Sequence, residues 1–204
     1  MREEVIISEG IKVLDNLKDF PEYYLAGGTG LALQLGHRIS LDFDLFWRGD
    51  IPEKLLSRIR NVFRGERIKV IVNHREQLTV SIGAVYTSFV KYSYPVVLDF
   101  IEYKGINILP AIEIGAMKAY ALGRRATMRD YVDLYFVLKT YSLVEVIKIC
   151  KRKYGNEFNK RLFLEQLIYL EDIEDVEIRF SKEKVERGEL TRFFEEEIKK
   201  IELE

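Results

Sequence analysis

Histidine and cysteine are scarce in this chain. Its 204 residues include two His and one Cys, too few for a Cys/His zinc cluster or a disulfide framework within one chain. A single thiol is at home in a reducing compartment, so we expect a cytoplasmic protein. Any catalytic chemistry must therefore rest on carboxylates, lysine, arginine and backbone groups.

Net charge and long apolar runs are also lacking. Lys and Arg total 32 and Asp and Glu total 33, a formal net charge of -1. This balance excludes general electrostatic attraction as the main means of binding nucleic acid or an anionic membrane, so such binding would need a local patch. No apolar run approaches the ~18 residues of a membrane span. The N-terminal MREEVIISEG is charged too early for a signal peptide, and we expect no membrane partner.

The chain does have enough apolar material for a core. Hydrophobic residues make up 48% and charged residues 32%, which argues against disorder. Periodicity predicts an α+β fold, with a mixed sheet and helices in an α/β core over 1–110 and a mostly helical C-terminal region over 111–204 that packs on this core. Strands are expected at 23–26, 37–47, 68–72, 77–82, 84–91 and 95–103. Helices are expected at 5–18, 29–36, 53–63, 111–140 with a break near 124–127, and from 143 onward with a looser stretch at 171–182.

A glycine pair lies between the first predicted strand and the helix that follows it. Gly27 and Gly28 are followed by Thr29, a candidate N-cap, and Gly36 ends the helix. The pair has two readings. It is either a tight turn or a place where backbone N–H groups approach a phosphate at a helix N-terminus.

Two aspartates share one face of the next predicted strand. In HRISLDFDLFW, Asp42 and Asp44 alternate with large apolar residues, so their carboxylates would leave the same face about 7 Å apart and could hold a cation jointly. The alternative is a solvated strand face with salt-bridge partners. Asp99 lies in PVVLDFIEY, which is apolar on both faces and therefore predicts a central strand and a buried carboxylate. Together the three would make a two-metal site for phosphoryl or nucleotidyl transfer.

Two motifs together resemble the AbiEii/AbiGii toxin family. The first is GGTGLAL followed by GHRISLDFDLF, residues 27–33 and 36–46. The second lies within 113–138, where Lys118 precedes an R-D-x-x-D pattern made by Arg129, Asp130 and Asp133. The resemblance covers about residues 20 to 140 with specific motifs and the tail more loosely.

This resemblance implies a minimal, polymerase-β-like nucleotidyltransferase fold. It also implies Mg²⁺-dependent transfer of a nucleotidyl group from an NTP such as ATP to an RNA, tRNA included, or to a protein, in a toxin–antitoxin or phage-defence system with a possible cognate antitoxin. The implied catalytic residues are Asp42, Asp44, Lys118 and Asp133. The implied metal ligands are Asp42 and Asp44, with Asp99 as a third. The implied nucleotide-binding residues are Gly27, Gly28, Thr29, His37, Arg38, Ser40, Arg125 and Arg129.

The residues themselves leave alternatives open in the second motif. Lys118 projects towards the strands or is a surface lysine. Arg125 and Arg129 face one phosphate, or pair with Asp130 and Asp133 in a solvated helix turn. His37 steadies Asp42 or a phosphate, or is structural.

Other features allow further readings. Some of Tyr86, Phe89, Tyr92 and Tyr94 could form a stacking surface for a base. The basic stretch formed by Lys148, Lys151, Arg152, Lys153, Lys160 and Arg161 is a solvated helix face or a contact for RNA phosphates. The amphipathic tail 182–204 caps the domain or binds a partner. The alternative function is a non-catalytic nucleotide- or RNA-binding or protein-interaction module on the same fold, and the oligomeric state stays open.

Overall fold

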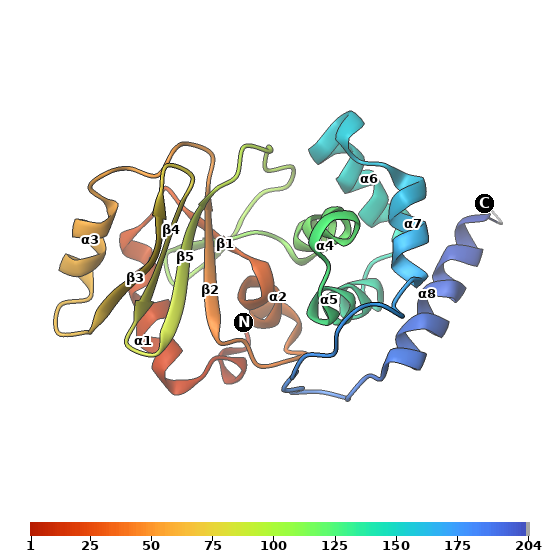
Figure 1. The fold of residues 1–204 in the computed structure, drawn as a ribbon, viewed down its shortest axis with the longest axis horizontal. Coiled ribbons are helices and arrows are strands. Elements are labelled where there is room, and N and C mark those ends of the chain that lie inside the picture. The colour runs from red at the N-terminus through yellow and green to blue at the C-terminus, as the bar shows by residue number, and fades with distance from the viewer. Residues whose placement is uncertain (203–204) are drawn as a thin grey trace. The chain divides into compact units, whose positions relative to one another are not determined.

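The computed structural model describes residues 1–202, and the last two residues of the predicted tail helix lie outside this range. The chain divides into two compact units, Met1–Pro110 and Ala111–Glu204 (Figure 1). The first is a mixed sheet with helices and the second is helical, which confirms the predicted fold class. In the described residues no helix is long and apolar enough to cross a membrane.

A seven-stranded mixed sheet in the order β3-β4-β5-β2-β1-β7-β6 organises the first unit. β2 lies between β1, which is antiparallel to it, and β5, which is parallel to it. The strands are β1 (Tyr24–Ala26), β2 (Asp42–Trp47), β3 (Ile68–His74), β4 (Gln77–Ile82), β5 (Val85–Lys91), β6 (Ile101–Tyr103) and β7 (Ile106–Ile108).

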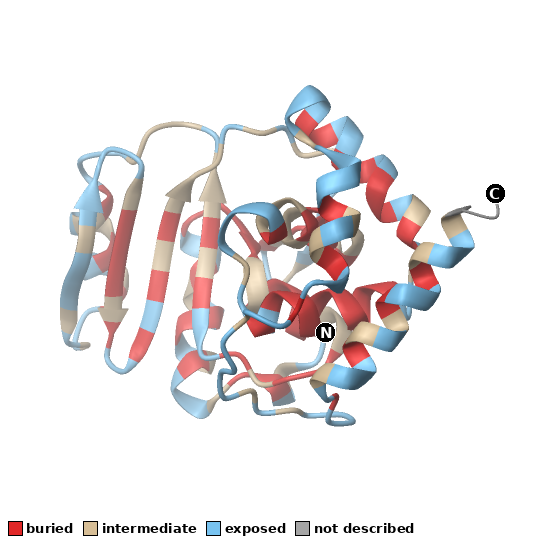
Figure 2. Cartoon of the chain, turned by 45° about the vertical axis from the view of Figure 1, so that its right-hand side comes forward, coloured by how far each residue is buried: buried red, intermediate tan, exposed pale blue. Residues whose placement is uncertain are grey.

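One face of the sheet carries the core of the first unit. Phe43, Leu45 and Phe89 are buried on this face with residues of α1 and α3. Successive side chains of a strand point to opposite faces, and along β2 and β5 buried residues alternate with exposed or half-buried ones (Figure 2). The helices of this unit are α1 (Ser8–Asn16), α2 (Gly27–Leu35) and α3 (Leu55–Val62), with short 3₁₀ helices at Glu3–Val5 and Leu17–Asp19.

Up to residue 202, the second unit is built from five α-helices. They are α4 (Ala111–Arg125), α5 (Met128–Leu138), α6 (Leu143–Tyr154), α7 (Lys160–Ile168) and α8 (Arg187–Glu202), with a 3₁₀ helix at Gly155–Glu157. The predicted break falls between α4 and α5. Leu190 and Phe194 of α8 are buried, and the Phe194 ring packs against Tyr131 of α5. The described part of the tail therefore caps its own unit.

Two predicted strands differ from the structure, and one observed strand is not predicted. The strand predicted at 37–47 begins only at Asp42, and Leu41, expected on the apolar face, is 44% exposed. The strand predicted at 95–103 shrinks to Ile101–Tyr103 at the edge of the sheet. The unpredicted strand β7 pairs with it through a two-residue turn, in which Lys104 and Gly105 both have positive φ.

Candidate nucleotidyltransferase site

The aspartate pair lies on β2 as its alternation predicts. Asp42 is exposed and Asp44 is half-buried, while the intervening Phe43 and the following Leu45 are 1% exposed on the opposite face. Anchoring by these two side chains fixes the direction in which both carboxylates point. The pair therefore stands on a rigid strand with the polar face open.

Gly27 brings the Asp44 carboxylate to the start of α2. Ala26 pairs with Asp44 across β1 and β2, and the chain then turns into the helix at Gly27 with a φ of 63°. A Cβ on Gly27 would lie 2.6 Å from Asp44 Oδ2. Only glycine fits here, because it tolerates the left-handed backbone and leaves room for the carboxylate. The positive end of the helix dipole stabilises this negative charge.

Gly28 makes room for an arginine in the same way. A Cβ at this position would lie 2.3 Å from Arg38 Nη2, and Arg38 is only 6% exposed. The guanidinium therefore lies against the first turn of α2, where backbone N–H groups lack partners within the helix. A cation beside such N–H groups is an arrangement that binds phosphate oxygens.

Thr29 and Ser40 contact Asp42 through their hydroxyl groups. The Thr29 hydroxyl donates to the main-chain carbonyl of Asp42 and lies 2.7 Å from Ser40 Oγ, which is itself 3.5 Å from Asp42 Oδ1. Both hydroxyl residues are buried, at 1% and 3% exposure. The prediction that Thr29 caps the helix is wrong, because α2 begins two residues earlier with Ala26 as its N-cap. Thr29 instead ties the first turn of α2 to the start of β2.

Asp99 does not have the predicted surroundings. It is exposed, it precedes β6 and belongs to no strand, and β6 is separated from β2 by β1 and β7. The prediction of a buried carboxylate on a central strand is therefore wrong. Within residues 1–202 no group of three or more His, Cys, Asp or Glu side chains is arranged to hold a metal ion. His37 is fully buried, which favours a structural role for its ring.

The two-carboxylate donor set of β2 fits magnesium. Mg²⁺ is commonly held by one or two carboxylates and completes its octahedron with water and substrate phosphates. Asp42 and Asp44 supply the carboxylates, and the start of α2, where the Arg38 guanidinium lies, adjoins Asp44. A third protein carboxylate is not needed for such a site.

In the second unit, Lys118 holds both aspartates of the second motif. Lys118 Nζ of α4 lies 2.7 Å from Asp130 Oδ1 and 2.9 Å from Asp133 Oδ2 of α5. The three side chains are 15%, 8% and 0% exposed. The alternative of a surface lysine is therefore excluded, and so is a solvated turn in which arginines pair with these aspartates.

Asp130 has a second function as a helix cap. Its Oδ2 accepts hydrogen bonds from Thr127 N at 2.9 Å and from Thr127 Oγ1 at 3.0 Å, completing a capping box at the start of α5. Arg125 and Arg129 are exposed and lie on different helices. Arg129 Nη2 donates to the carbonyl of Glu177 at 3.4 Å.

A buried ion pair between α4 and α6 was not predicted. Lys153 Nζ lies 2.7 Å from Glu113 Oε1, and both side chains are 0% exposed. Burial lowers the pKa of Lys153, while the Glu113 carboxylate opposes this shift. Lys153 is thus not part of a solvated basic face, whereas the other five bases of that stretch are exposed. A signal was present in the sequence, since Lys153 lies four residues after the core residue Ile149.

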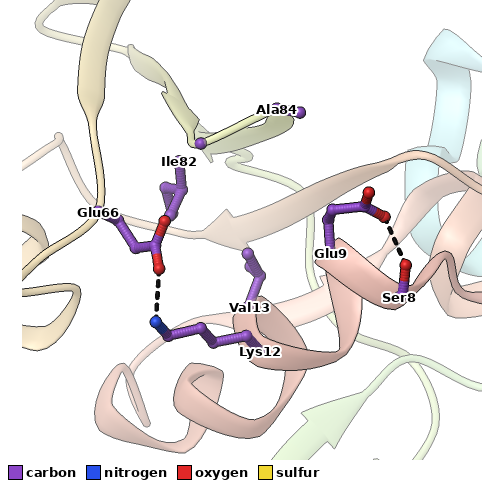
Figure 3. Close-up of a pocket in the computed structure, with 8 residues that line it drawn as sticks. Ser8, Glu9, Lys12, Val13, Glu66, Ile82 and Ala84 are labelled. Atoms are coloured by element: carbon purple, nitrogen blue, oxygen red, sulfur yellow. Dashed lines mark hydrogen bonds and ion pairs between the residues drawn. The ribbon is translucent and has the colours of Figure 1, made fainter.

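A separate pocket of about 370 Å³ lies between α1 and the turn after β4 (Figure 3). Lys12 of α1 pairs with Glu66 at 2.5 Å across it. Glu9 accepts a hydrogen bond from Ser8 at 2.8 Å, which lowers the pKa of Glu9. These charges are satisfied among themselves, and the pocket adjoins the core face of the sheet rather than the face of Asp42.

Known proteins share this fold. JHP933 from Helicobacter pylori is 18% identical, with a TM-score of 0.60 over 97% of this chain and 95% of that chain. MenT4, a nucleotidyltransferase toxin from Mycobacterium tuberculosis H37Rv, is 14% identical, with a TM-score of 0.56 over 94% and 84% of the two chains. The fold is therefore that of the nucleotidyltransferases.

A family model and a sequence relative identify the family. Residues 65–202 match the model described as nucleotidyl transferase AbiEii toxin, type IV TA system. An uncharacterized protein of Aquifex aeolicus (strain VF5), aq_aa25, is 31% identical over 155 residues, 74% of this chain and 75% of that protein. The chain belongs to the AbiEii nucleotidyltransferase toxin family. The matched residues include Lys118, Asp130 and Asp133 and begin after the glycine and aspartate pairs.

Proposed function

We propose that the chain transfers a nucleotidyl group from an NTP to an acceptor hydroxyl in a magnesium-dependent reaction. The observation that carries this proposal is the junction of α2 and β2. There Gly27 admits the Asp44 carboxylate and Gly28 admits the Arg38 guanidinium at the same helix N-terminus. A phosphate-binding turn and a metal-binding carboxylate thus adjoin, as transfer of a phosphate-linked group requires.

Each residue has a task in this reaction. The first-turn N–H groups of α2 and Arg38 bind the triphosphate, Asp42 and Asp44 hold Mg²⁺, and Thr29 with Ser40 keeps Asp42 in place. Held by Asp42 and Asp44, Mg²⁺ would supply charge compensation for the transferring phosphate and activation of the attacking hydroxyl. The acceptor oxygen bonds to the α-phosphorus, the bond to the β-phosphate oxygen breaks, pyrophosphate leaves and the hydroxyl proton passes to water.

We further propose that Lys118 and Asp133 take part in catalysis and that the protein acts as the toxin of a toxin–antitoxin pair. Family membership supports both statements. The buried cluster that Lys118 forms with the two aspartates gives the motif a definite structure, in which the lysine charge is held in one position.

Conservative changes of the two aspartates test the proposal. Asp42→Asn and Asp44→Asn keep the side-chain volume but remove the charge that binds Mg²⁺. We expect each to lower transfer of label from an α-labelled NTP into total RNA or protein by roughly 100-fold or more, the order of loss when a transition-state charge interaction is removed. The melting temperature should change little, because Asp42 is exposed and Asp44 half-buried.

Asp19→Asn is the matched control, because Asp19 is exposed in the same unit, and its transfer rate should equal that of the unmodified protein. Wild-type rates in both Asp42→Asn and Asp44→Asn would refute the assignment of the site. Nucleotide binding without transfer to any acceptor would favour the alternative of a non-catalytic module.

A further inference from the structure

The register of four strands places one row of side chains beside Asp42. Asp42 of β2 pairs with Tyr86 of β5, Tyr86 pairs with Ser81 of β4, and Ser81 pairs with Lys69 of β3. Directly paired residues point to the same face of a sheet. The row therefore runs across the polar face, and at about 4.8 Å per strand Lys69 is about 14 Å from Asp42.

The adjoining row on the same face is also polar. Asp44 pairs with Ser88, and Ser88 pairs with Thr79. The hydroxyls of Ser88 and Thr79 are 3.1 Å apart, and Gln77 Nε2 donates to Thr79 Oγ1 at 2.9 Å. Hydroxyls and amides thus line the surface that leads away from the carboxylates, with half-buried Val72 beyond them.

Tyr86 is the one exposed aromatic side chain paired directly with a site carboxylate in the described chain. It is 54% exposed. Of the other aromatic residues proposed for stacking, Phe89 is fully buried in the core and Tyr92 packs edge-on against Phe46 and Tyr94. The exposed ring keeps an apolar face that a stacked ligand would cover, and covering such a face is favourable.

The sheet order determines which substrate Tyr86 can meet. β2 has β1 on one side and β5 on the other. The start of α2 follows β1, so the proposed function puts the NTP phosphates on the β1 side of Asp44. Tyr86 is on the β5 side, where the attacking hydroxyl must approach the α-phosphorus from the face opposite the leaving pyrophosphate.

We propose that Tyr86 is the residue that positions a single-stranded RNA acceptor at this site. The ring stacks on the base of the nucleotide that carries the attacking hydroxyl, and Lys69 binds a backbone phosphate further along the strand. An aromatic platform beside a cation is the common way of binding single strands without sequence preference. The inference that the bound RNA is an acceptor rests on the proposed transferase function. The binding of RNA by Tyr86 does not depend on turnover.

Binding without chemistry tests the contact. A fluorescein-labelled 12-nucleotide single-stranded RNA with a free 3′-hydroxyl is titrated with the full chain, without NTP, and anisotropy gives Kd. We expect Tyr86→Ala to weaken binding roughly 5- to 100-fold and Tyr86→Phe to stay within about twofold, since stacking needs the ring and not its hydroxyl. Lys69→Gln should weaken binding. It should also reduce the slope of log K against log salt concentration by about 1, as expected for the loss of one phosphate contact.

Two controls separate this surface from general effects. Tyr169→Ala removes a tyrosine that is 47% exposed in the helical unit, and Lys54→Gln removes an exposed lysine just before α3. Both should bind RNA like the unmodified protein. Equal melting temperatures of all variants show that none has lost its fold.

Transfer kinetics then separate the two proposals. With labelled NTP and the same RNA, Tyr86→Ala should raise KM for RNA and leave KM for NTP unchanged. An unchanged KM for RNA, no RNA binding by the unmodified protein, or label found only on protein would overturn the role of Tyr86 and leave transferase activity intact. RNA binding that depends on Tyr86, with no transfer, would support the contact and refute the proposed function.

Discussion

At the scale of single residues, the two glycines at the start of α2 decide what the site can hold. At each glycine, a functional group occupies the space that a Cβ would take. This group is Asp44 Oδ2 at Gly27 and Arg38 Nη2 at Gly28. The sequence predicts the position of both glycines, and taken alone the pair favours a tight turn over a phosphate contact. The contacts with Asp44 and Arg38 support the proposed phosphate contact, and they follow from tertiary packing rather than from local sequence.

Gly27→Ala separates backbone strain from displacement of the carboxylate. The new methyl group must push Asp44 aside, and the backbone at φ 63° disfavours any side chain. We expect transfer to fall at least 10-fold, with a loss of about 1 kcal/mol or more in the free energy of unfolding. Label transfer and chemical denaturation measure the two effects.

The matched control is Gly65→Ala, in which φ is 90° and nothing lies within 4 Å of the new Cβ. It carries the backbone strain without touching the site. A loss of stability in both variants with loss of transfer in Gly27→Ala alone is the expected result. Equal transfer by both variants at equal folded fraction would contradict the role of the Gly27 contact.

At the scale of elements, the bounds of a strand are predicted well where apolar and polar residues alternate over its whole length. They are predicted poorly where the pairing with neighbouring strands determines whether a segment is a strand. β4 is predicted at 77–82 and observed at Gln77–Ile82, because its alternation continues across the whole strand. β7 has three residues, too few to show a period, and only its partners make it a strand. The segment 95–103 is apolar on both faces and resembles a central strand, but only Ile101–Tyr103 forms a strand, and it lies at the edge of the sheet.

The buried pair between α4 and α6 gives a prediction of its own. Glu113→Leu or Lys153→Met alone leaves one buried group without its ionic partner, and we expect a loss of about 3–5 kcal/mol in the free energy of unfolding. The double change Glu113→Leu with Lys153→Met removes both charges and should recover most of this loss. Urea denaturation of the single and double variants forms a thermodynamic cycle.

Surface pairs provide the comparison for that cycle. Lys139 and Glu183 pair with side chains 43% and 54% exposed, and breaking such a pair should cost at most about 1 kcal/mol. Additive effects of the Glu113 and Lys153 changes would contradict a specific buried interaction between α4 and α6.

At the scale of the whole molecule, a net charge near zero is the sum of acidic and basic groups that lie in different places and have different roles. Some acids are grouped where a cation offsets them, as Asp130 and Asp133 are by Lys118, and Asp42 and Asp44 stand on an open sheet face. Exposed bases are found at Lys69 on the sheet and along α6 and α7. Composition alone excludes a generally basic nucleic-acid binder, and the strand register supports the local surface that we propose at Tyr86 and Lys69.

The helical unit contributes to the function of the whole chain if Lys118 does more than support the fold. Lys118→Met leaves two buried aspartates without their cation, so it tests charge and structure together, whereas Lys118→Arg keeps the charge. If Lys118 stabilises charge on the transferring phosphate, Lys118→Met should lower kcat roughly 100-fold, and Lys118→Arg should also lose much of the rate because a planar guanidinium cannot replace a compact ammonium.

Activity per folded molecule distinguishes the two roles, with Lys139→Met as the control lysine on a neighbouring surface. A purely structural lysine predicts the opposite pattern. The melting temperature of Lys118→Met then falls, its folded fraction transfers nucleotide at the normal rate, and Lys118→Arg restores both properties. Measuring kcat and KM for NTP below each variant's melting transition decides between these outcomes. At such temperatures every variant is folded, so a lower kcat then reports the loss of a catalytic charge and not a loss of folded protein.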